Sequence, residues 1–223
     1  MLELHYAPGN ANMAPHMLLQ ALDLPHRLVL VDRAQTAHKQ PAYLALNPNG
    51  LIPVLVDRRE DGDLVLYETA AICLHLADQC PDSGQMPALG TPARGEAYKW
   101  LVWMSTTLQT TLMHHFYPAR VLGDGQGACA ATVSAHAQAQ VGQLLGQLEA
   151  QLGRHGGPWL LGGQQTLLDF YGLMLCRWTR GFQGDASPPA RQRPVLQAWL
   201  QRVLALTPVQ RALAAEGLVA PFI

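Results

Sequence analysis

The chain has 223 residues, of which 49% are hydrophobic and 14% are charged, and its formal net charge at pH 7 is −1. This composition supplies enough apolar side chains for a packed core and excludes intrinsic disorder, and the length suits two modest domains or one large one. Acidic and basic residues are mixed along the chain, which excludes the basic stripe of a nucleic-acid-binding protein and the basic amphipathic segment of a membrane-surface protein.

The N-terminal residues MLELHYAPGN contain neither the basic region nor the apolar region of a secretory signal. The longest apolar runs are also far shorter than the ~20 residues that a membrane span needs. We interpret the cysteines as reduced and mostly buried thiols, because they form no CxxC pair; they are Cys73, Cys80, Cys129 and Cys176. We therefore expect a cytoplasmic protein with no membrane partner.

Short apolar runs alternate with helical patterns over the first 80 residues. The expected elements in chain order are a strand at 2–6, a helix at 15–22, a strand at 27–31, an irregular segment at 32–45 with one short helix, strands at 52–56 and 64–67, and a helix at 68–77. The turn-rich sequence DRREDGD between the last two strands predicts a hairpin. The order β-α-β-(α)-β-β-α predicts a mixed four-stranded sheet with helices packed on it.

A segment rich in proline, glycine and serine, CPDSGQMPALG at 80–90, follows this region and is interpreted as a linker. The pattern beyond it is helical throughout, with helices expected at 93–115, 130–152, 166–180, 195–206 and 209–215. The stretch VLGDGQG at 121–127 would let the two long helices lie antiparallel. The sequence therefore predicts an α/β domain at 1–79, a linker at 80–90 and an all-helical domain at 91–223.

Two features of the helical region bear on its folding. Thr166-Leu-Leu-Asp169 has the spacing of a capping box, in which each side chain covers a backbone N–H at the start of a helix. Trp100, Trp103 and Trp178 stand at helical spacing and are interpreted as core residues.

Five segments spread over nearly the whole chain form a joint pattern: YAPGNANMAPH at 6–16, NPNGLIPVL at 47–55, YETAAICLHLAD at 67–78, TLLDFYG at 166–172 and VQRALAAEGL at 209–218. Together they resemble the glutathione S-transferase family, and its bacterial beta class in particular. The resemblance implies a thioredoxin-like glutathione-binding domain, a helical domain that contributes the pocket for an electrophile, and a homodimer with a role in detoxification. Glutathione would be the co-substrate.

The segment NPNGLIPVL has a structural interpretation within this resemblance. The family holds the bond equivalent to Ile52–Pro53 in the cis form, which turns the backbone of Ile52 outward. The N–H and C=O groups of Ile52 could then pair with the cysteinyl part of glutathione as an added strand would. Without the family pattern, an ordinary trans proline at the start of a strand would be expected, because few X-Pro bonds are cis.

Glu68 and Thr69 stand where a helix is expected to begin. The N-terminus of a helix presents unpaired N–H groups and a partial positive charge, which suit a carboxylate. The resemblance implies that Thr69 binds the γ-glutamyl carboxylate and that Glu68 accepts from the γ-glutamyl ammonium. The alternative is that Thr69 caps the helix and Glu68 is solvated.

Other candidate glutathione ligands are assigned less directly. His38 and Lys39 lie in the loop where some relatives hold the glycyl carboxylate, and a solvated loop is the alternative for this segment. We take Lys39 as the candidate ligand there, together with Asn10 and Leu51, which flank the expected site.

The catalytic position departs from the family pattern. Beta-class relatives carry a Cys-Ser pair where this chain has Ala11 and Asn12. Without a cysteine at this position, a mixed disulfide with glutathione cannot form there. The Asn12 amide could donate to the glutathione thiolate, although asparagine is also a good N-cap residue. Tyr6 is the second candidate, because other classes use a tyrosine hydroxyl from this region; its alternative role is packing against the first helix.

The pocket for the electrophile is expected on the first long helix of the helical domain. Gln109 takes the place of a histidine that beta-class members often have, and His114 and Tyr117 follow about one turn later. We assign these three residues to the pocket; the alternative for His114 and Tyr117 is an exposed helix end. His114 and His115 are adjacent and point in different directions, so we expect no metal site.

The sequence thus predicts an enzyme that binds glutathione and promotes attack of its thiolate on a hydrophobic electrophile, with reduction of organic hydroperoxides as a related activity. The alternative is a non-catalytic protein of the same fold that binds a ligand or a protein partner, because fold does not fix function. An isomerase of the maleylacetoacetate type is disfavoured, since that group has a Ser-Ser-Cys stretch where this chain has Asn10, Ala11 and Asn12.

Overall fold

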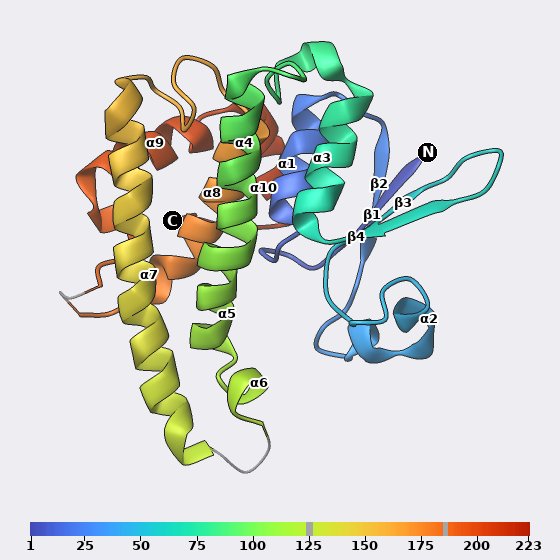
Figure 1. Ribbon diagram of the computed structural model, residues 1–223. Helices are drawn as coiled ribbons and strands as arrows, with labels where there is room; N and C mark the ends of the chain where they lie inside the picture. Colours follow the sequence, from blue (N-terminus) through green and yellow to red (C-terminus); the bar gives the residue numbers. More distant parts are fainter. Residues whose placement is uncertain (124–126, 185–186) are drawn as a thin grey trace. The chain divides into compact units, whose positions relative to one another are not determined.

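The computed structural model describes residues 1–123, 127–184 and 187–223 and divides into two compact units (Figure 1). The first unit comprises Met1–Met86 and Leu204–Phe222, and the second comprises Pro87–Val203 together with Ile223. The boundary at Met86 falls within the segment interpreted as a linker. The turn expected at 121–127 lies in part outside the described residues, because it includes 124–126.

The first unit is built on a four-stranded mixed sheet, which confirms the fold predicted from the sequence. Its strands are β1 (Leu2–Tyr6), β2 (His26–Leu30), β3 (Val54–Asp57) and β4 (Leu64–Tyr67), in the order β2-β1-β3-β4. β1 is parallel to β2 and antiparallel to β3, and β3 is antiparallel to β4. β3, at the centre of the sheet, is buried along its whole length, whereas the edge strands β2 and β4 are partly exposed.

Three helices of the first unit pack against one another, and α3 (Thr69–Gln79) contacts β3 and β4 of the sheet (Figure 1). They are α1 (Met13–Ala21), α3 (Thr69–Gln79) and α10 (Thr207–Ala215), and α1 contacts both of the others. Residues 13–19 of α1 are all buried, because they are covered by these neighbours. The sequence analysis assigned α10 to the helical domain, but by its contacts it belongs to the first unit.

A short segment between β2 and β3 completes the first unit. It contains the 3-10 helix η1 (Ala37–Lys39) and the four-residue helix α2 (Pro41–Leu44), where one short helix was expected. Another 3-10 turn, η2 (Pro81–Ser83), follows α3.

The second unit is helical. Its elements are α4 (Pro92–Trp103), the π-helical turn η3 (Met104–Leu108), α5 (Gln109–Phe116), α6 (Ala119–Leu122), α7 (Gly127–His155), α8 (Leu167–Trp178), the 3-10 turns η4 (Thr179–Gly181) and η5 (Ala190–Gln192), and α9 (Pro194–Leu204). The long helix expected at 93–115 is therefore interrupted by a wider π turn, and α5 lies antiparallel along α7 (Figure 1). α8 is buried from Leu167 to Arg177, as a helix at the centre of a unit should be.

The start of α8 depends on Asp169. Its carboxylate accepts hydrogen bonds from the backbone N–H of Thr166 at 2.9 Å, the N–H of Leu160 at 2.9 Å and the indole N–H of Trp199 at 2.8 Å. Thr166 is the N-cap residue, as the capping box predicts. One buried side chain thus joins the helix start to the preceding loop and to α9.

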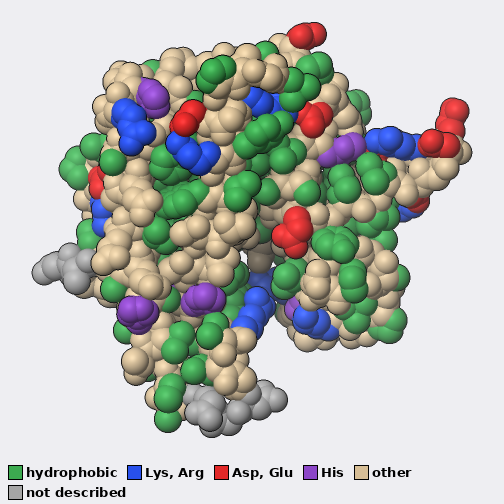
Figure 2. All heavy atoms as spheres, viewed as in Figure 1, with side chains coloured by type: hydrophobic (Ala, Val, Ile, Leu, Met, Phe, Trp, Pro, Cys, Tyr) green, Lys and Arg blue, Asp and Glu red, His purple; other side chains and the backbone are tan. Residues whose placement is uncertain are grey.

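Charged side chains of both signs are distributed over the surface. On the face shown in Figure 2, acidic and basic groups are interspersed, including at the β3–β4 hairpin, which carries Arg58, Arg59, Glu60, Asp61 and Asp63. Within the described residues, no helix combines the length and the apolarity needed to cross a membrane.

The capping network yields a prediction about stability. In Asp169→Asn, an NH2 group replaces one carboxylate oxygen. At least one of the three N–H donors then loses its acceptor, so we expect the free energy of unfolding to fall by about 1–3 kcal/mol. Urea denaturation measures this quantity. Asp61→Asn, at an exposed position of the hairpin, is the matched control and should change the stability by less than about 0.5 kcal/mol. Equal stability of the Asp169 variant and the wild type would contradict the role of the network.

Candidate functional site

The strand register brings several candidate glutathione ligands to one end of the sheet. His5 of β1 pairs with Val54 of β3, so the next residue of β1, Tyr6, lies beside Pro53. Val54 also pairs with Tyr67 of β4, which places Glu68 beside Pro53 on the other side. Residues far apart in the sequence therefore meet where β1 and β4 end and β3 begins.

Ile52 offers an unpaired backbone edge at this end of the sheet. The Ile52–Pro53 bond is cis, as the resemblance implied. Neither the N–H nor the C=O group of Ile52 has a hydrogen-bond partner among the described residues. Its side chain packs against a buried cluster that includes Val31 and Val54. The side chain is thus anchored while the backbone donor and acceptor remain available to an extended ligand.

The N-terminus of α3 lies next to this edge. Glu68 is the N-cap residue, with an exposed side chain and a φ of +71°, a conformation that is costly for a residue other than glycine. Ile72 is the first residue whose N–H reaches back to Glu68, so the N–H groups before it have no partner within the helix. No side chain caps α3, which rules out capping by Thr69. The arrangement suits an anion at the helix end.

Lys39 lies over the turn that precedes Ile52. Its Nζ atom is 3.4 Å from the carbonyl oxygen of Asn49. Gly50 has a φ of +59°, and a Cβ atom there would come within 2.8 Å of both the His38 carbonyl oxygen and Lys39 Nζ. Only glycine allows this close approach. The predicted ligand Lys39 therefore lies against the turn at Asn49 and Gly50 that leads to Ile52.

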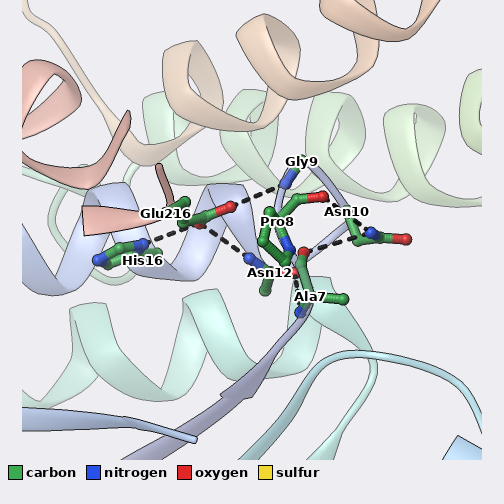
Figure 3. Close-up of polar contacts among 7 residues, drawn as sticks. All are labelled: Ala7, Pro8, Gly9, Asn10, Asn12, His16 and Glu216. Atoms are coloured by element: carbon green, nitrogen blue, oxygen red, sulfur yellow. Dashed lines mark hydrogen bonds and ion pairs between the residues drawn. The ribbon is translucent and has the colours of Figure 1, made fainter. Parts of the chain in front are cut away.

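The Asn12 side chain has a different environment from the one expected for a thiol donor (Figure 3). It is 0% exposed, its amide nitrogen donates to a carboxylate oxygen of Glu216 at 2.9 Å, and its oxygen accepts from the N–H of Ala7 at 3.2 Å. Asn12 occupies the N-cap position of α1, as its residue type suggests, but its side chain makes no capping bond to the helix. Asn12 instead connects the end of β1 to the residue that follows α10.

Glu216 is the centre of this network, and the sequence analysis did not identify it. The same carboxylate oxygen that binds Asn12 lies 2.8 Å from Nδ1 of His16, and the other accepts from the N–H of Gly9 at 2.9 Å (Figure 3). The side chains of His16 and Glu216 are 0% and 1% exposed. Glu216 is 200 residues from His16 in the sequence, and only the joint family pattern connects the two segments that contain them.

The remaining residues of the β1–α1 loop are more accessible. The amide nitrogen of Asn10 donates to the carbonyl oxygens of Ala7 and Pro8 at 3.2 and 3.1 Å, and its oxygen accepts from Arg33 at 2.8 Å. The half-buried Tyr6 hydroxyl has no hydrogen-bond partner within the part of the chain that is described. Tyr6 therefore keeps a donor available at the sheet end, whereas the Asn12 amide is engaged.

The residues assigned to the electrophile pocket all lie in the second unit. Gln109 begins α5 directly after the π turn and accepts a hydrogen bond from the Tyr171 hydroxyl at 2.6 Å. His114 is half-buried, and the ring of Tyr117 lies 4.1 Å below the Arg120 guanidinium. The π turn Met104–Leu108 directly precedes Gln109, and such turns are frequent at functional sites.

A separate pocket of about 300 Å³ also lies in the second unit, between α4 and α7. It is lined by Lys99, Trp100, Trp103, Gln147, Ala150 and Arg154, and it includes none of the residues assigned to the electrophile pocket. Trp100 is buried, as predicted, but Trp103 and Trp178 are only partly buried. In residues 1–123, 127–184 and 187–223, no group of three or more His, Cys, Asp or Glu side chains is placed to hold a metal ion.

Comparison with known proteins adds independent evidence. The family model described as glutathione S-transferase, N-terminal domain, matches residues 13–79, and the model described as glutathione S-transferase, C-terminal domain, matches residues 104–207. Glutathione S-transferase GST-4.5 of Xanthomonas campestris is 31% identical to this chain, over 97% of this chain and 100% of its own length.

Two solved structures show the same architecture. A glutathione transferase homologue from Sulfitobacter, with bound glutathione, superposes with a TM-score of 0.84 at 26% identity, over 98% of this chain and 99% of that one. A beta-class glutathione S-transferase from Sphingomonas chungbukensis gives a TM-score of 0.78 at 27% identity, over 97% and 100% of the two chains. On the fold, the motifs and these matches over nearly its full length, the chain belongs to the glutathione S-transferase family.

Proposed function

We propose that this protein is a glutathione transferase that binds glutathione at the end of its sheet and promotes attack of the glutathione thiolate on a hydrophobic electrophile. A carbon–sulfur bond forms. The electron pair of the bond that breaks, from the attacked carbon to its leaving group or within the electrophile's double bond, moves to the leaving group or to the acceptor atom of the electrophile. One observation carries the proposal: the free backbone edge of Ile52 and the N-terminus of α3 lie side by side at the same end of the sheet.

This pair of features matches the two ends of a γ-glutamyl-cysteinyl unit. The N–H and C=O groups of Ile52 bind the cysteinyl backbone, and Pro53 fixes the direction of that edge. The N-terminus of α3, with the Thr69 hydroxyl, binds the γ-glutamyl carboxylate, while the exposed Glu68 carboxylate accepts from the ammonium. Lys39, close to the Gly50 turn, binds the glycyl carboxylate as a cation.

The thiol needs a donor that favours its ionised form, because an ordinary cysteine thiol titrates near ~8.5. The Tyr6 hydroxyl is the donor that the geometry favours, because it is the one without another partner among the described residues. The partial positive charge at the N-terminus of α1 adds to the stabilisation. Asn12 and Asn10 stabilise the loop between β1 and α1, because the amide nitrogen of each donates to an atom of the protein itself.

Glu216 gives this loop its shape. Its two oxygens accept from Gly9 and Asn12 in the loop between β1 and α1, and one of them contacts His16 in α1, so the loop and the helix are both attached to the end of α10. A buried carboxylate is stable only when donors satisfy it. Loss of Glu216 would therefore release the loop that carries the thiol partner.

The second unit supplies the electrophile pocket, with Gln109, His114 and Tyr117 on α5 and the residue that follows it. Pockets of this kind combine apolar walls with a few polar groups that orient the substrate. Reduction of an organic hydroperoxide is a related reaction of the same thiolate.

The specific class, assembly and compartment are part of the same proposal. The five sequence segments and the likeness to the Sphingomonas chungbukensis enzyme support the beta class. We further propose a cytoplasmic homodimer that acts in detoxification.

A non-catalytic binding protein is the second candidate, and a specific observation favours it. Ala11 and Asn12 stand where relatives have the catalytic Cys-Ser pair, and the Asn12 amide is already bonded to Glu216. Calorimetric titration with glutathione, combined with the thiolate absorbance of the complex as a function of pH, separates the two candidates. Binding with a lowered thiol pKa supports the transferase. Binding without a lowered pKa favours the second candidate, and failure to bind glutathione contradicts the proposed site.

Glu68→Ala and Thr69→Ala test the γ-glutamyl position. Each removes one polar contact to a charged group of glutathione, so we expect the Kd for glutathione to rise about 10-fold or more. Calorimetry measures the Kd, and Glu60→Ala, at an exposed position of the hairpin, is the control that should bind as the wild type does. Unchanged affinity in both variants would show that the γ-glutamyl group binds elsewhere.

Tyr6→Phe and Asn12→Ala separate thiol activation from loop support. Tyr6→Phe should raise the pKa of the bound glutathione thiol by about one to two, because a hydrogen bond to a charged group is lost. Asn12→Ala should leave that pKa nearly unchanged but lower the free energy of unfolding by about 1–3 kcal/mol, because Ala7 and Glu216 lose a partner. Thiolate absorbance and urea denaturation are the measurements. If instead Asn12→Ala raises the thiol pKa and Tyr6→Phe does not, Asn12 is the residue that activates the thiol.

Glu216→Gln tests the attachment of the loop. The neutral amide presents an NH2 group to atoms that need an acceptor, so the free energy of unfolding should fall by about 2–4 kcal/mol. Urea denaturation checks this, with Glu60→Gln as the exposed control. If the two variants are equally stable, the Glu216 network does not hold the loop.

A further inference from the structure

The carbonyl oxygen of Leu51 is bound by two buried side chains. The Tyr43 hydroxyl donates to it at 2.8 Å, and the Asn47 amide nitrogen also donates to it at 2.8 Å. Tyr43 is 6% exposed and Asn47 is 2% exposed. One loop carbonyl thus receives two donors from the interior of the first unit, directly beside the proposed glutathione edge.

Both donors are themselves held in place. The Tyr43 ring belongs to the buried cluster with Val31, Val54 and Val56, and burial raises the pKa of its hydroxyl, which therefore stays protonated. The Asn47 side-chain oxygen accepts from the N–H of Asn49 at 3.0 Å, and its backbone N–H donates to the Tyr43 carbonyl at 3.0 Å. The position of the Leu51 carbonyl is therefore set by the core of the unit.

Planarity of the peptide transfers this constraint to Ile52. The C=O of Leu51 and the N–H of Ile52 belong to one peptide unit, and this unit is trans. In a trans peptide the N–H points opposite to the C=O. When two donors fix the carbonyl on one side, they fix the direction of the N–H on the other side, and they also polarise it as a donor. The Ile52 N–H finds no acceptor among the described residues.

We propose that Tyr43 and Asn47 are positioning residues for glutathione: by holding the Leu51 carbonyl, they aim the Ile52 N–H at the carbonyl oxygen of the cysteinyl residue. This inference rests on the proposed placement of glutathione along Ile52. Neither side chain touches the ligand. Their effect should therefore appear in the affinity for glutathione and not in the rate of the chemical step at saturation.

Tyr43→Phe is the main test, because it removes one donor and keeps the ring in the core. We expect the Kd and KM for glutathione to rise about 3- to 10-fold, with kcat at saturating glutathione within about twofold of the wild type. The amide resonance of Ile52 should shift in the free protein. Asn47→Asp is the second variant. Its ionised carboxylate still accepts from the Asn49 N–H but has no N–H to donate to the Leu51 carbonyl, so it should also raise the Kd for glutathione. Tyr98→Phe, at an exposed position of α4, is the control.

Binding of S-methylglutathione, which has no ionisable thiol, identifies the step affected. An equal loss of affinity for glutathione and S-methylglutathione supports the proposal. A loss for glutathione alone would place Tyr43 in thiol activation and overturn it. Wild-type affinity in a folded Tyr43→Phe variant, with weakened binding in Glu68→Ala and Thr69→Ala, would also overturn it while the proposed site stands. Wild-type affinity in all three variants would instead reject the proposed site.

Discussion

The antiparallel pairing of β3 with both β1 and β4 is the constraint on which the candidate site depends. This ladder places Tyr6, Pro53 and Glu68 side by side, although they come from three separate segments of the chain. A shift of one residue in the register would move each of them relative to the others and exchange the side chains on the two packed faces of β3. Because β3 is buried along its whole length, such a shift is strongly disfavoured, and the same burial that stabilises the sheet defines the geometry of the site.

Buried polar side chains fix the loop conformations that the strand pairing does not determine. Glu216 holds the β1–α1 loop, Tyr43 and Asn47 hold the Leu51 carbonyl, and Asp169 holds the start of α8 in the other unit. In each case one oxygen takes two or more hydrogen bonds, and the side chains that hold the contact are buried, where an unsatisfied polar group would be costly. These contacts define loop shapes that hydrophobic packing alone would leave variable.

The β1–α1 loop illustrates how two departures from the family's Cys-Ser pair change the roles of the residues there. With alanine at 11 and asparagine at 12, the chain has no thiol at this position and carries an amide long enough to reach Glu216 directly. An amide that is fully buried and bonded supports the loop. The accessible groups nearby, above all the Tyr6 hydroxyl, are then the ones available to a ligand.

The sequence by itself determined the local features of this protein: the strand at 2–6, the hairpin at 57–64 and the helix start at Thr166, because each depends on neighbouring residues. The cis bond between Ile52 and Pro53 followed from the family resemblance. Only the tertiary structure decided the role of Asn12, the packing of α10 with the first unit and the importance of Glu216. The physical reason is distance along the chain: a contact between residues 200 positions apart leaves no periodicity or spacing in the sequence, and it exists only once the two helices have packed together.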